Sequence, residues 1–321
     1  LKVVVGRDAR ISGAIVQDLV QASLQALGID VVDLGLSTTP TVEVAVPMEN
    51  ANGGIILTAS HNPKQWNALK LLNEKGEFVS AEDGALILSI AENEAFDFAQ
   101  VDDLGGVEKK DYLQKHIDGV LALSTVDVGI VKAAEFKVVV DAVNSTGGIY
   151  LPALLRQMGV EVVELYCEPN GHFPHNPEPL PEHLHDLCSM VTKTKADLGF
   201  VVDPDVDRLA IVSEDGSLFG EEYTLVAVAD HVLKTHKGDT VSNLSSTRAL
   251  RDVTEAHGFA YHASAVGEVN VVTKMKEVGA PIGGEGNGGI IYPELHYGRD
   301  SLVGVALFLT HLAQSKMTCS A

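Results

Sequence analysis

Short runs of β-branched and aliphatic residues alternate along the chain with longer stretches whose apolar residues recur at helical spacing. This alternation is typical of βαβ units and predicts a mainly parallel sheet. Near the N-terminus it predicts strands at 2–5, 30–34 and 54–57 and helices at 14–27 and 41–49. A polar stretch from about 92 to 110 then predicts the exit from a first domain.

The same alternation restarts twice. In the middle of the chain the predicted elements are strands at 137–141, 160–165 and 197–202, a helix at 148–158, and a helix that ends near 195 after a proline-rich loop. Toward the C-terminus they are strands at 240–244, 259–263 and 281–284 and helices at 247–257, 268–278 and 301–314. We therefore predict three successive α/β domains with mixed, mainly parallel sheets flanked by helices, at 1–118, 119–217 and 218–321.

Composition narrows the functional classes. A net charge of -21 disfavours binding to nucleic acid or to an anionic membrane, because both need clustered Lys and Arg. The longest apolar run, near 302–312, is too short to cross a bilayer, and no signal-peptide pattern opens the chain. With three cysteines at no metal-like spacing, these features predict a cytoplasmic protein with reduced thiols. The absence of an initiator Met suggests a fragment.

Three acidic residues, Asp203, Asp205 and Asp207, directly follow an apolar predicted strand. Their spacing places all three on one side of an extended chain. Two like charges about 4 Å apart repel by roughly 4 kcal/mol at an effective dielectric near 20, so the group favours a cation, and its hard oxygens suit Mg²⁺ or Ca²⁺. An EF-hand loop is disfavoured because Arg208 stands where its glycine is needed, although Glu214 matches the twelfth position. A solvated acidic turn is the remaining alternative.

Two further segments are candidates. Ser60, in Thr-Ala-Ser-His-Asn-Pro after a predicted strand, is either a nucleophile or part of a polar turn. The glycine-rich segment 283–289 contains Glu285 and Asn287, which suit sugar hydroxyls, although a flexible hairpin would look similar. Arg10 and Lys70 supply cations near Ser60 in the sequence, where Arg can hold a phosphate and Lys can move a proton.

Taken together, these motifs resemble the α-D-phosphohexomutase family, which includes phosphoglucosamine mutase, phosphomannomutase and phosphoglucomutase. The resemblance rests on Val-Gly-Arg-Asp-Ala-Arg at 5–10, the Ser60 motif, the acidic segment 203–208 and Gly-Glu-Gly-Asn-Gly at 284–288, in the family's order. It covers essentially the whole chain. It implies that this chain supplies three of four domains, without the extreme N-terminus and without the C-terminal domain that grips the substrate phosphate, so that binding of a sugar phosphate would be weak.

The resemblance also implies a mechanism. Ser60 would be a phosphoserine on one Mg²⁺ held by Asp203, Asp205 and Asp207, with Arg10 and Arg208 neutralising charge. The phosphoryl group would pass to a hexose phosphate, giving a bisphosphate that turns over and returns the other phosphoryl group to Ser60. His61 and Lys70 are the further catalytic candidates, with Lys70 as the proton-transfer group, and Glu285 and Asn287 would bind sugar hydroxyls.

The chain departs from the family pattern at three places. Ala68 replaces a glycine before Lys70, Asn287 stands for a serine, and Gly289 stands for a histidine. This variant, with Tyr-Gly-Arg-Asp at 297–300, is most similar to phosphoglucosamine mutases of archaeal type. Activity on mannose or glucose phosphates is the alternative, and the sequence does not indicate an oligomeric state.

Two readings from other classes compete. A hydrolase of haloacid-dehalogenase type would use Asp203 as its nucleophile, but that motif belongs near an N-terminal strand. A fragment that binds sugar phosphate without catalysis is disfavoured by the intact Ser60 and the complete acidic group.

Overall fold

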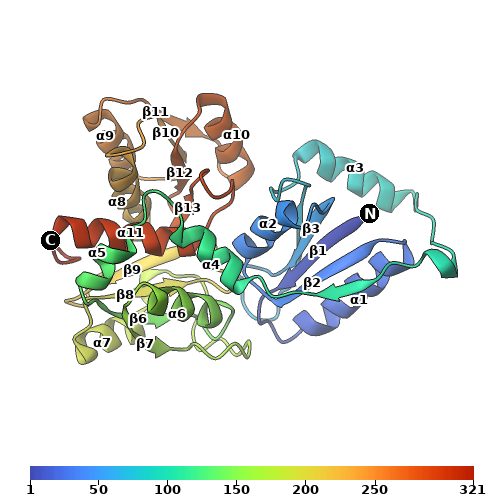
Figure 1. Ribbon diagram of the computed structural model, residues 1–321, viewed down its shortest axis with the longest axis horizontal. Coiled ribbons are helices and arrows are strands. Elements are labelled where there is room, and N and C mark those ends of the chain that lie inside the picture. The colour runs from blue at the N-terminus through green and yellow to red at the C-terminus, as the bar shows by residue number, and fades with distance from the viewer.

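The computed structural model describes all 321 residues, which form three sheets flanked by helices (Figure 1). We name the parts around these sheets, in chain order, the first, second and third units. Within each unit the first strand is central, the second lies on one side, and the third and then the fourth lie on the other. The first three strands are parallel and the fourth is antiparallel to the third. The predicted α/β class with mixed, mainly parallel sheets is confirmed.

The first unit contains a five-stranded sheet in the order β4-β3-β1-β2-β5. Its strands are β1 (Lys2–Arg7), β2 (Asp30–Leu36), β3 (Gly53–Leu57), β4 (Leu69–Leu72) and β5 (Val107–Lys109). Its helices are α1 (Gly13–Ala26), α2 (Thr39–Met48), α3 (Ala81–Glu92) and the short 3₁₀ helix η1 (Val101–Asp103). Strand β5 pairs with β2, so the chain is still part of the first sheet at the end of the polar stretch that was expected to leave it.

Helix α2 lies on the side of the first unit that faces the rest of the molecule (Figure 1). It begins where Thr38 Oγ1 accepts the Thr41 N–H at 3.1 Å, and Pro40 occupies its first turn, where no N–H is needed. Its first eight residues are buried because α2 packs against β1 and β3 on one side and against helix α4 (Leu113–Leu121) on the other.

The second unit contains a four-stranded sheet in the order β7-β6-β8-β9, and two helices precede it. Its strands are β6 (Lys137–Asp141), β7 (Glu161–Leu165), β8 (Leu198–Val202) and β9 (Leu209–Ser213). Its helices are α4 (Leu113–Leu121), α5 (Val128–Ala133), α6 (Gly147–Gln157), the 3₁₀ helix η2 (Pro181–His183) and α7 (His185–Thr194). Strand β8 is buried along its full length, which explains why it is a continuous apolar run rather than an alternating one.

The third unit contains a four-stranded sheet in the order β11-β10-β12-β13. Its strands are β10 (Thr240–Asn243), β11 (Tyr261–Ser264), β12 (Ile282–Glu285) and β13 (Gly289–Ile291). Its helices are α8 (Glu221–Leu233), α9 (Ala249–Ala256), α10 (Glu268–Val278) and α11 (Ser301–Ser315).

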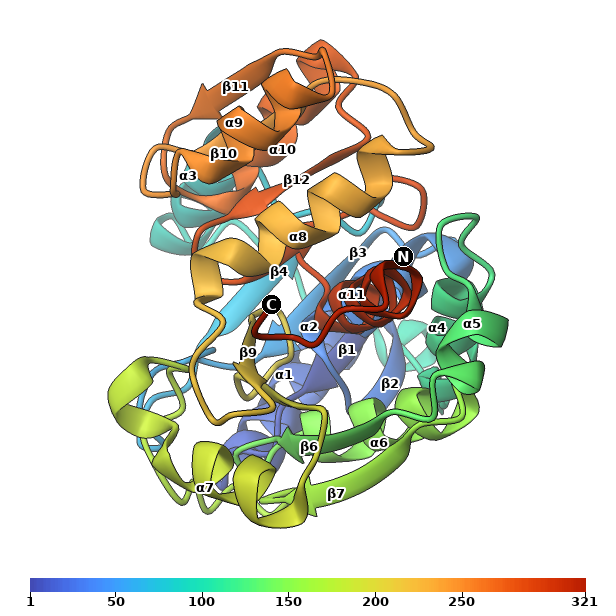
Figure 2. The same cartoon turned by 90° about the vertical axis from the view of Figure 1, so that its left-hand side faces the viewer.

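Helix α11 joins the second and third units into one packed body. It contacts α8 and β13 of the third unit and α4, α5, α6 and β9 of the second, and Figure 2 shows it nearly end-on among these elements. The largest apolar cluster, of 39 buried residues, consequently spans both units. The first unit has separate clusters of 10 and 3 buried residues on the two faces of its sheet. None of the helices is both long and apolar enough to cross a membrane.

The sequence-based prediction lacks the fourth strand of each unit and helices α3, α4, α5 and α8. Strands β4 and β13 span only four and three residues and follow polar or glycine-rich loops, so their apolar signal is short. Strand β9 is an apolar run that could have been recognised. In each unit the fourth strand runs antiparallel to the third, so the two strands form a hairpin.

A buried polar cluster fastens the first unit to the start of α11. Asp300 Oδ2 accepts hydrogen bonds from His116 Nε2 at 2.8 Å and His296 Nε2 at 3.1 Å, while its Oδ1 caps α11 by accepting the Leu302 N–H at 2.8 Å. His296 Nδ1 lies 3.2 Å from Glu43 Oε2 on α2. Burial alone would lower the pKa of His296, but Asp300 and Glu43 raise it to about 10. A histidinium therefore holds two carboxylates together across the junction.

We expect the stability contributed by His296 to depend on pH. Its pKa is raised on folding from 6.5 to about 10, so its contribution is complete below about pH 6.5 and is lost as the pH rises toward 10. His296→Gln should cost about 3 kcal/mol of unfolding free energy at pH 6, because it removes the positive charge that the buried carboxylates of Glu43 and Asp300 share, and less at pH 9. Urea unfolding of both proteins at several pH values measures this difference.

The matched control is His236→Gln, since His236 is partly exposed and lies 3.6 Å from Glu294. It should change the urea midpoint little at either pH. A cost of His296→Gln that stayed constant or grew between pH 6 and pH 9 would contradict a protonated His296 in the junction.

Candidate active site

Ser60 lies in the hairpin between β3 and β4, at the carboxyl end of β3. Its φ of 47° is in the left-handed region, which a serine adopts at a cost of order 1–3 kcal/mol and which clusters at functional sites. Thr58 Oγ1 accepts the Ser60 N–H at 2.9 Å and donates to Asp8 Oδ2 at 2.7 Å. The loop therefore holds Ser60 in a strained conformation by side chains from its own hairpin and from the end of β1.

Arg10 holds this loop through hydrogen bonds to its backbone carbonyl oxygens. Its Nε donates to Asp8 at 2.9 Å, and its four remaining N–H groups point at the carbonyl oxygens of Ser60, Asn62, Pro63 and Trp66 at 2.5–3.0 Å. A guanidinium has five N–H donors, so none is left for a phosphate. The structure thus differs from the expectation that Arg10 neutralises the phosphoryl group: the arginine is almost fully buried and positions the backbone around Ser60.

The acidic residues Asp203, Asp205 and Asp207 lie in the hairpin between β8 and β9 of the second unit. All three are buried, and one oxygen from each lies within 4.8 Å of the others. Val206 between them has a φ of 67°, which is an outlier for a β-branched residue. Its side chain is held in the main apolar cluster and its carbonyl accepts the Ser301 N–H, so packing enforces the turn that brings the carboxylates together.

Asp205 and Asp207 each have one oxygen that accepts hydrogen bonds and one that is available. Asp205 Oδ2 accepts hydrogen bonds from Thr39 Oγ1 and Lys70 Nζ, and Asp207 Oδ2 accepts from Lys70 and Arg299. By contrast, Asp205 Oδ1 and Asp207 Oδ1 are buried without any hydrogen-bond partner. Buried orphan carboxylate oxygens are costly unless a cation satisfies them, so this donor set fits a hard ion such as Mg²⁺.

Ser60 and the acidic loop meet although they lie far apart in the sequence. Ser60 Oγ donates to Asp203 Oδ2 at 2.7 Å. Burial and the charges of Asp207 and Asp205 raise the pKa of Asp203 well above its usual range. His61 Nδ1 lies 3.4 Å from Ser60 Oγ, and burial lowers the pKa of this histidine, which favours the neutral ring. The structure thus places the predicted hydroxyl beside the predicted metal ligands, with a neutral imidazole at its edge.

Lys70 enters the site from β4 of the first unit. Its Nζ lies 2.6 Å from Asp205 Oδ2 and 2.9 Å from Asp207 Oδ2. Burial opposes its charge, but the two carboxylates raise the pKa of Lys70 above its ordinary value, so it stays protonated. The neighbouring Ala68 is exposed and has no positive φ, so the replacement of a glycine there is accommodated without strain.

Arg208 follows the acidic loop and faces the proline-rich segment. Its Nη1 lies 3.4 Å from Glu178 Oε1, its Nε is buried without a partner, and its own N–H donates to Asp203 Oδ1 at 3.2 Å. His61 Nε2 is 3.8 Å from the same Glu178 oxygen. Unlike Arg10, Arg208 thus keeps a donor free while its backbone binds Asp203.

Glu285 and Asn287, the expected sugar-binding residues, lie in the hairpin between β12 and β13 of the third unit. Glu285 is buried, with Oε1 accepting from Asn243 Nδ2 at 2.7 Å and Oε2 from Arg299 Nη1 at 2.8 Å. This differs from the expectation that Glu285 binds sugar hydroxyls directly, because protein donors already bind both of its oxygens. The Asn287 side chain makes one protein contact, to the Gly289 N–H at 3.3 Å, and its amide nitrogen has no protein partner.

Sequence reasoning did not identify Arg299 or Thr39 as site residues. Thr39 begins α2, and its hydroxyl donates to the anchored oxygen of Asp205. Arg299 lies in the segment between β13 and α11 and reaches Asp207. No spacing rule links these residues to the acidic loop. The only signal for Arg299 was its place in the Tyr-Gly-Arg-Asp segment beside the glycine-rich loop.

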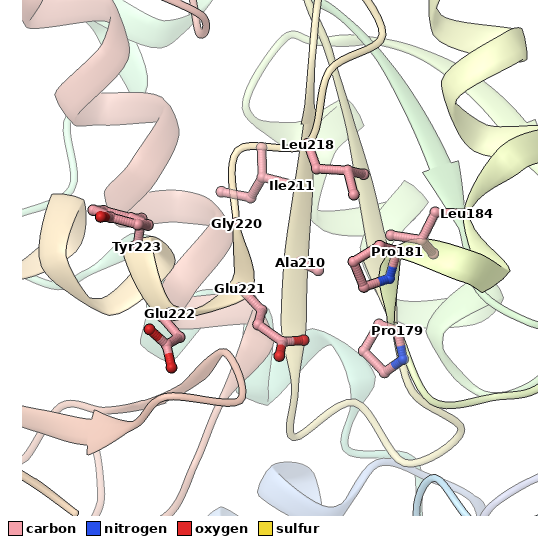
Figure 3. Close-up of a pocket in the computed structure, with 10 residues that line it drawn as sticks. All are labelled: Pro179, Pro181, Leu184, Ala210, Ile211, Leu218, Gly220, Glu221, Glu222 and Tyr223. Atoms are coloured by element: carbon pink, nitrogen blue, oxygen red, sulfur yellow. The ribbon is translucent and has the colours of Figure 1, made fainter. Parts of the chain in front are cut away.

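A separate apolar pocket of about 220 Å³ lies beside β9 (Figure 3). Pro179 and Pro181 form one wall, and Glu221 and Tyr223 at the start of α8 lie on the other side. None of its lining residues is one of the predicted catalytic, metal-binding or sugar-binding residues. With two acidic side chains, Glu221 and Glu222, and few polar donors, it does not suit an anionic sugar.

Comparison with known proteins places this geometry in a family. The model of α/β/α domain I of phosphoglucomutase/phosphomannomutase matches residues 1–98, that of domain II matches 114–216 and that of domain III matches 220–321. A phosphoglucomutase/phosphomannomutase from Thermococcus kodakarensis is 36% identical over 315 residues, covering 98% of this chain and 69% of that protein. A probable phosphoglucosamine mutase from Methanopyrus kandleri is 33% identical over 315 residues, covering 97% and 68%.

Solved structures agree with this similarity. A phosphoglucomutase/phosphomannomutase family protein from Burkholderia thailandensis superposes with a TM-score of 0.88 at 29% identity, covering 98% of this chain and 69% of the other. A putative phosphomannomutase from Thermus thermophilus gives 0.91 at 27% identity, covering 99% and 73%. The domain matches, the relatives and the shared architecture lead to one conclusion: the chain belongs to the phosphoglucomutase/phosphomannomutase family.

Proposed function

We propose that this protein is a phosphohexomutase that interconverts hexose 6-phosphate and hexose 1-phosphate through a phosphoserine at Ser60. The observation that carries the proposal is the contact of Ser60 Oγ with Asp203 at 2.7 Å, within a group of buried carboxylates that has two unpartnered oxygens. A structural serine in a turn has no need of such a neighbour. The family membership of the chain supports the same reaction class.

Asp203, Asp205 and Asp207 would hold one Mg²⁺, which supplies positive charge opposite the phosphoryl oxygens when bound. A phosphoserine carries about -1.5 to -2 charges, so Arg208 and Lys70 would add neutralising charge from the two sides of the loop. In the forward step a sugar hydroxyl oxygen bonds to phosphorus while the Ser60 Oγ–phosphorus bond breaks. The hydroxyl proton leaves, Ser60 Oγ gains a proton, and the product is a hexose bisphosphate.

Lys70 and His61 would handle these protons. Lys70 is protonated and faces the site from β4, and His61 lies beside Ser60 Oγ with a lowered pKa, so the two residues offer an acid and a base on different sides. After the bisphosphate has turned over, the same steps run in reverse with the other phosphoryl group. Ser60 thereby regains its phosphoryl group, so a full cycle consumes no further phosphoryl donor.

Among substrates we propose glucosamine phosphate first, with mannose and glucose phosphates as the alternative. The Tyr-Gly-Arg-Asp segment and the Gly-Glu-Gly-Asn-Gly-Gly loop favour the first choice. Several relatives carry the description probable phosphoglucosamine mutase, while the Thermococcus relative is described as a phosphoglucomutase/phosphomannomutase. Asn287 would contact the sugar through its free amide nitrogen, and Glu285 would support this loop.

The phosphoserine can be tested by intact mass. Incubation of the chain with glucose 1,6-bisphosphate and Mg²⁺ should add about 80 Da, mapped to Ser60 by peptide sequencing. Ser60→Ala should take up no phosphate, because its side chain has no oxygen to form the ester.

The matched control is Ser80→Ala, since Ser80 is an exposed helix cap that lies outside the site, and this variant should label like the wild type. Phosphate on Asp203 instead of Ser60 would favour a hydrolase of haloacid-dehalogenase type. No label on any residue would favour a fragment that binds sugar phosphate without catalysis.

Metal binding should depend on the orphan oxygens. Asp205→Asn should weaken Mg²⁺ binding by at least about tenfold in isothermal titration calorimetry, because it removes a charged ligand. Mg²⁺ should also raise the melting temperature of the wild type more than that of the variant, since an ion that binds only the folded state stabilises it. Asp215→Asn, in an exposed turn after β9, is the control and should bind Mg²⁺ normally. Equal affinities for all three proteins would rule out this site.

The substrate can be identified from the forward step, the transfer of the phosphoryl group from Ser60 to the sugar. The phosphorylated chain is mixed in turn with glucosamine 6-phosphate, mannose 6-phosphate and glucose 6-phosphate, and loss of the phosphate from Ser60 is followed by mass. We expect glucosamine 6-phosphate to remove it fastest, by at least about tenfold, a difference of about 1.4 kcal/mol in transition-state binding. Faster removal by mannose or glucose 6-phosphate would replace the first choice with the alternative.

A further inference from the structure

Arg299 binds three carboxylates that come from three separate elements. Its Nη2 donates to Asp207 Oδ2 at 2.7 Å, its Nη1 to Glu285 Oε2 at 2.8 Å and its Nε to Glu268 Oε2 at 2.9 Å. Asp207 belongs to the hairpin of the second unit, Glu285 to the end of β12, and Glu268 to the start of α10. One side chain therefore links the metal loop to the sugar loop, across the boundary between two units.

The path of this side chain depends on a glycine. A β-carbon at position 289 would overlap Arg299 Cδ, so the arginine reaches Asp207 only because Gly289 leaves its space empty. The backbone of Arg299 also bridges to Ile291 of β13, and its N–H donates to Glu268 Oε1 at 3.3 Å. Arg299 is thus fixed along its whole length, with little freedom to swing away from any of its three partners.

The contacts of Arg299 decide which oxygens remain available. It shares Asp207 Oδ2 with Lys70, which leaves Asp207 Oδ1 unpartnered and available to a cation. On the other side it holds Glu285 Oε2, while Asn243 holds Oε1. A displacement or change of charge at Asp207 therefore alters the position or charge balance of Glu285 through Arg299. Glu285 directly precedes the turn 286–288, which carries Asn287.

The chemistry requires an arginine. The guanidinium is planar and offers separate donors in a fixed fork, so it can satisfy three carboxylates at once, whereas the ammonium of lysine is a single point on a flexible stem. The charges of Asp207, Glu268 and Glu285 raise the pKa of Arg299 above its already high value despite burial, and the residue stays charged. The link is therefore a permanent cation between two loops that are each acidic.

We propose that Arg299 is a positioning residue that couples occupation of the metal site by a divalent cation to ordering of the sugar loop at 286–289. The inference rests on the proposed function, because it takes the acidic loop as the metal site and the glycine-rich loop as the sugar-binding loop. A cation on Asp207 Oδ1 fixes that carboxylate, and Arg299 transmits the restraint to Glu285. By reciprocity, hexose phosphate on the sugar loop tightens cation binding by the same factor.

The first test uses the metal alone. Amide hydrogen exchange is followed by mass spectrometry in the peptide that contains residues 286–289, with and without Mg²⁺. In the wild type we expect Mg²⁺ to slow exchange of this peptide by at least about fivefold. In Arg299→Lys, which keeps the charge but not the fork, we expect the effect of Mg²⁺ to vanish although Mg²⁺ still binds. Arg251→Lys is the control, because Arg251 is a surface residue paired with Asp252, and it should behave like the wild type.

The second test measures the coupling itself. Mg²⁺ affinity is determined by calorimetry with and without saturating glucosamine 6-phosphate, and the ratio of the two affinities is compared among variants. A purely structural role of Arg299 would weaken both affinities together and leave the ratio unchanged. We expect the ratio to be at least about fivefold in the wild type and near one in Arg299→Lys.

Glu285→Gln provides a second variant in case Arg299→Lys does not fold. It removes the ion pair between Arg299 and Glu285 and leaves the contact of Arg299 with Asp207. It should also bring the ratio near one. A wild type that binds Mg²⁺ and takes up phosphate on Ser60, yet shows neither slower exchange nor a ratio above one, overturns the coupling and leaves the proposed function intact. A wild type that binds no Mg²⁺ overturns both.

Discussion

The architecture of the site depends on one electrostatic constraint, the burial of three carboxylates in a single turn. Asp203, Asp205 and Asp207 cannot all be charged there without nearby cations, because the interior screens their repulsion poorly. The protein meets this constraint with cations from outside the second unit. Lys70 comes from the first unit and Arg299 from the third, and both bind the carboxylates directly. The charge of one loop thus requires that three parts of the chain come together.

Backbone strain is concentrated at the same place. Ser60 and Val206 both have a positive φ, and each is held by contacts that lie outside its own hairpin. Arg10 and, through Thr58, Asp8 restrain the serine loop, while the main apolar cluster and the start of α11 restrain the acidic loop. Strained turns persist only where the surroundings over-determine them. The extensive core that joins the second and third units therefore also keeps the three aspartates in place.

Much of this could be predicted from the sequence, and the exceptions have physical reasons. The parallel strands were predictable because buried strands such as β8 are continuous apolar runs, and the acidic loop because its spacing is unusual. The role of Arg10 was not predictable, since only the folded loop shows that four carbonyl oxygens occupy its guanidinium. Arg299 was missed because its partners are set by tertiary packing. The burial of Glu285 likewise follows from Asn243 and Arg299, which no local pattern connects to it.

The first four strands have the same order in all three units, and this has a consequence for how such a site can change over evolution. Each unit ends its third strand in a hairpin turn, and the three turns carry different side chains: Ser60 and His61 in the first, three aspartates in the second, and a glycine-rich segment with Asn287 in the third. Such an arrangement is what duplication of one ancestral module produces, with the scaffold retained and the turns diverging. Because the turns lie outside the strands that define the module, selection can alter the substrate preference at one turn without having to rebuild the fold or the chemistry of the other two.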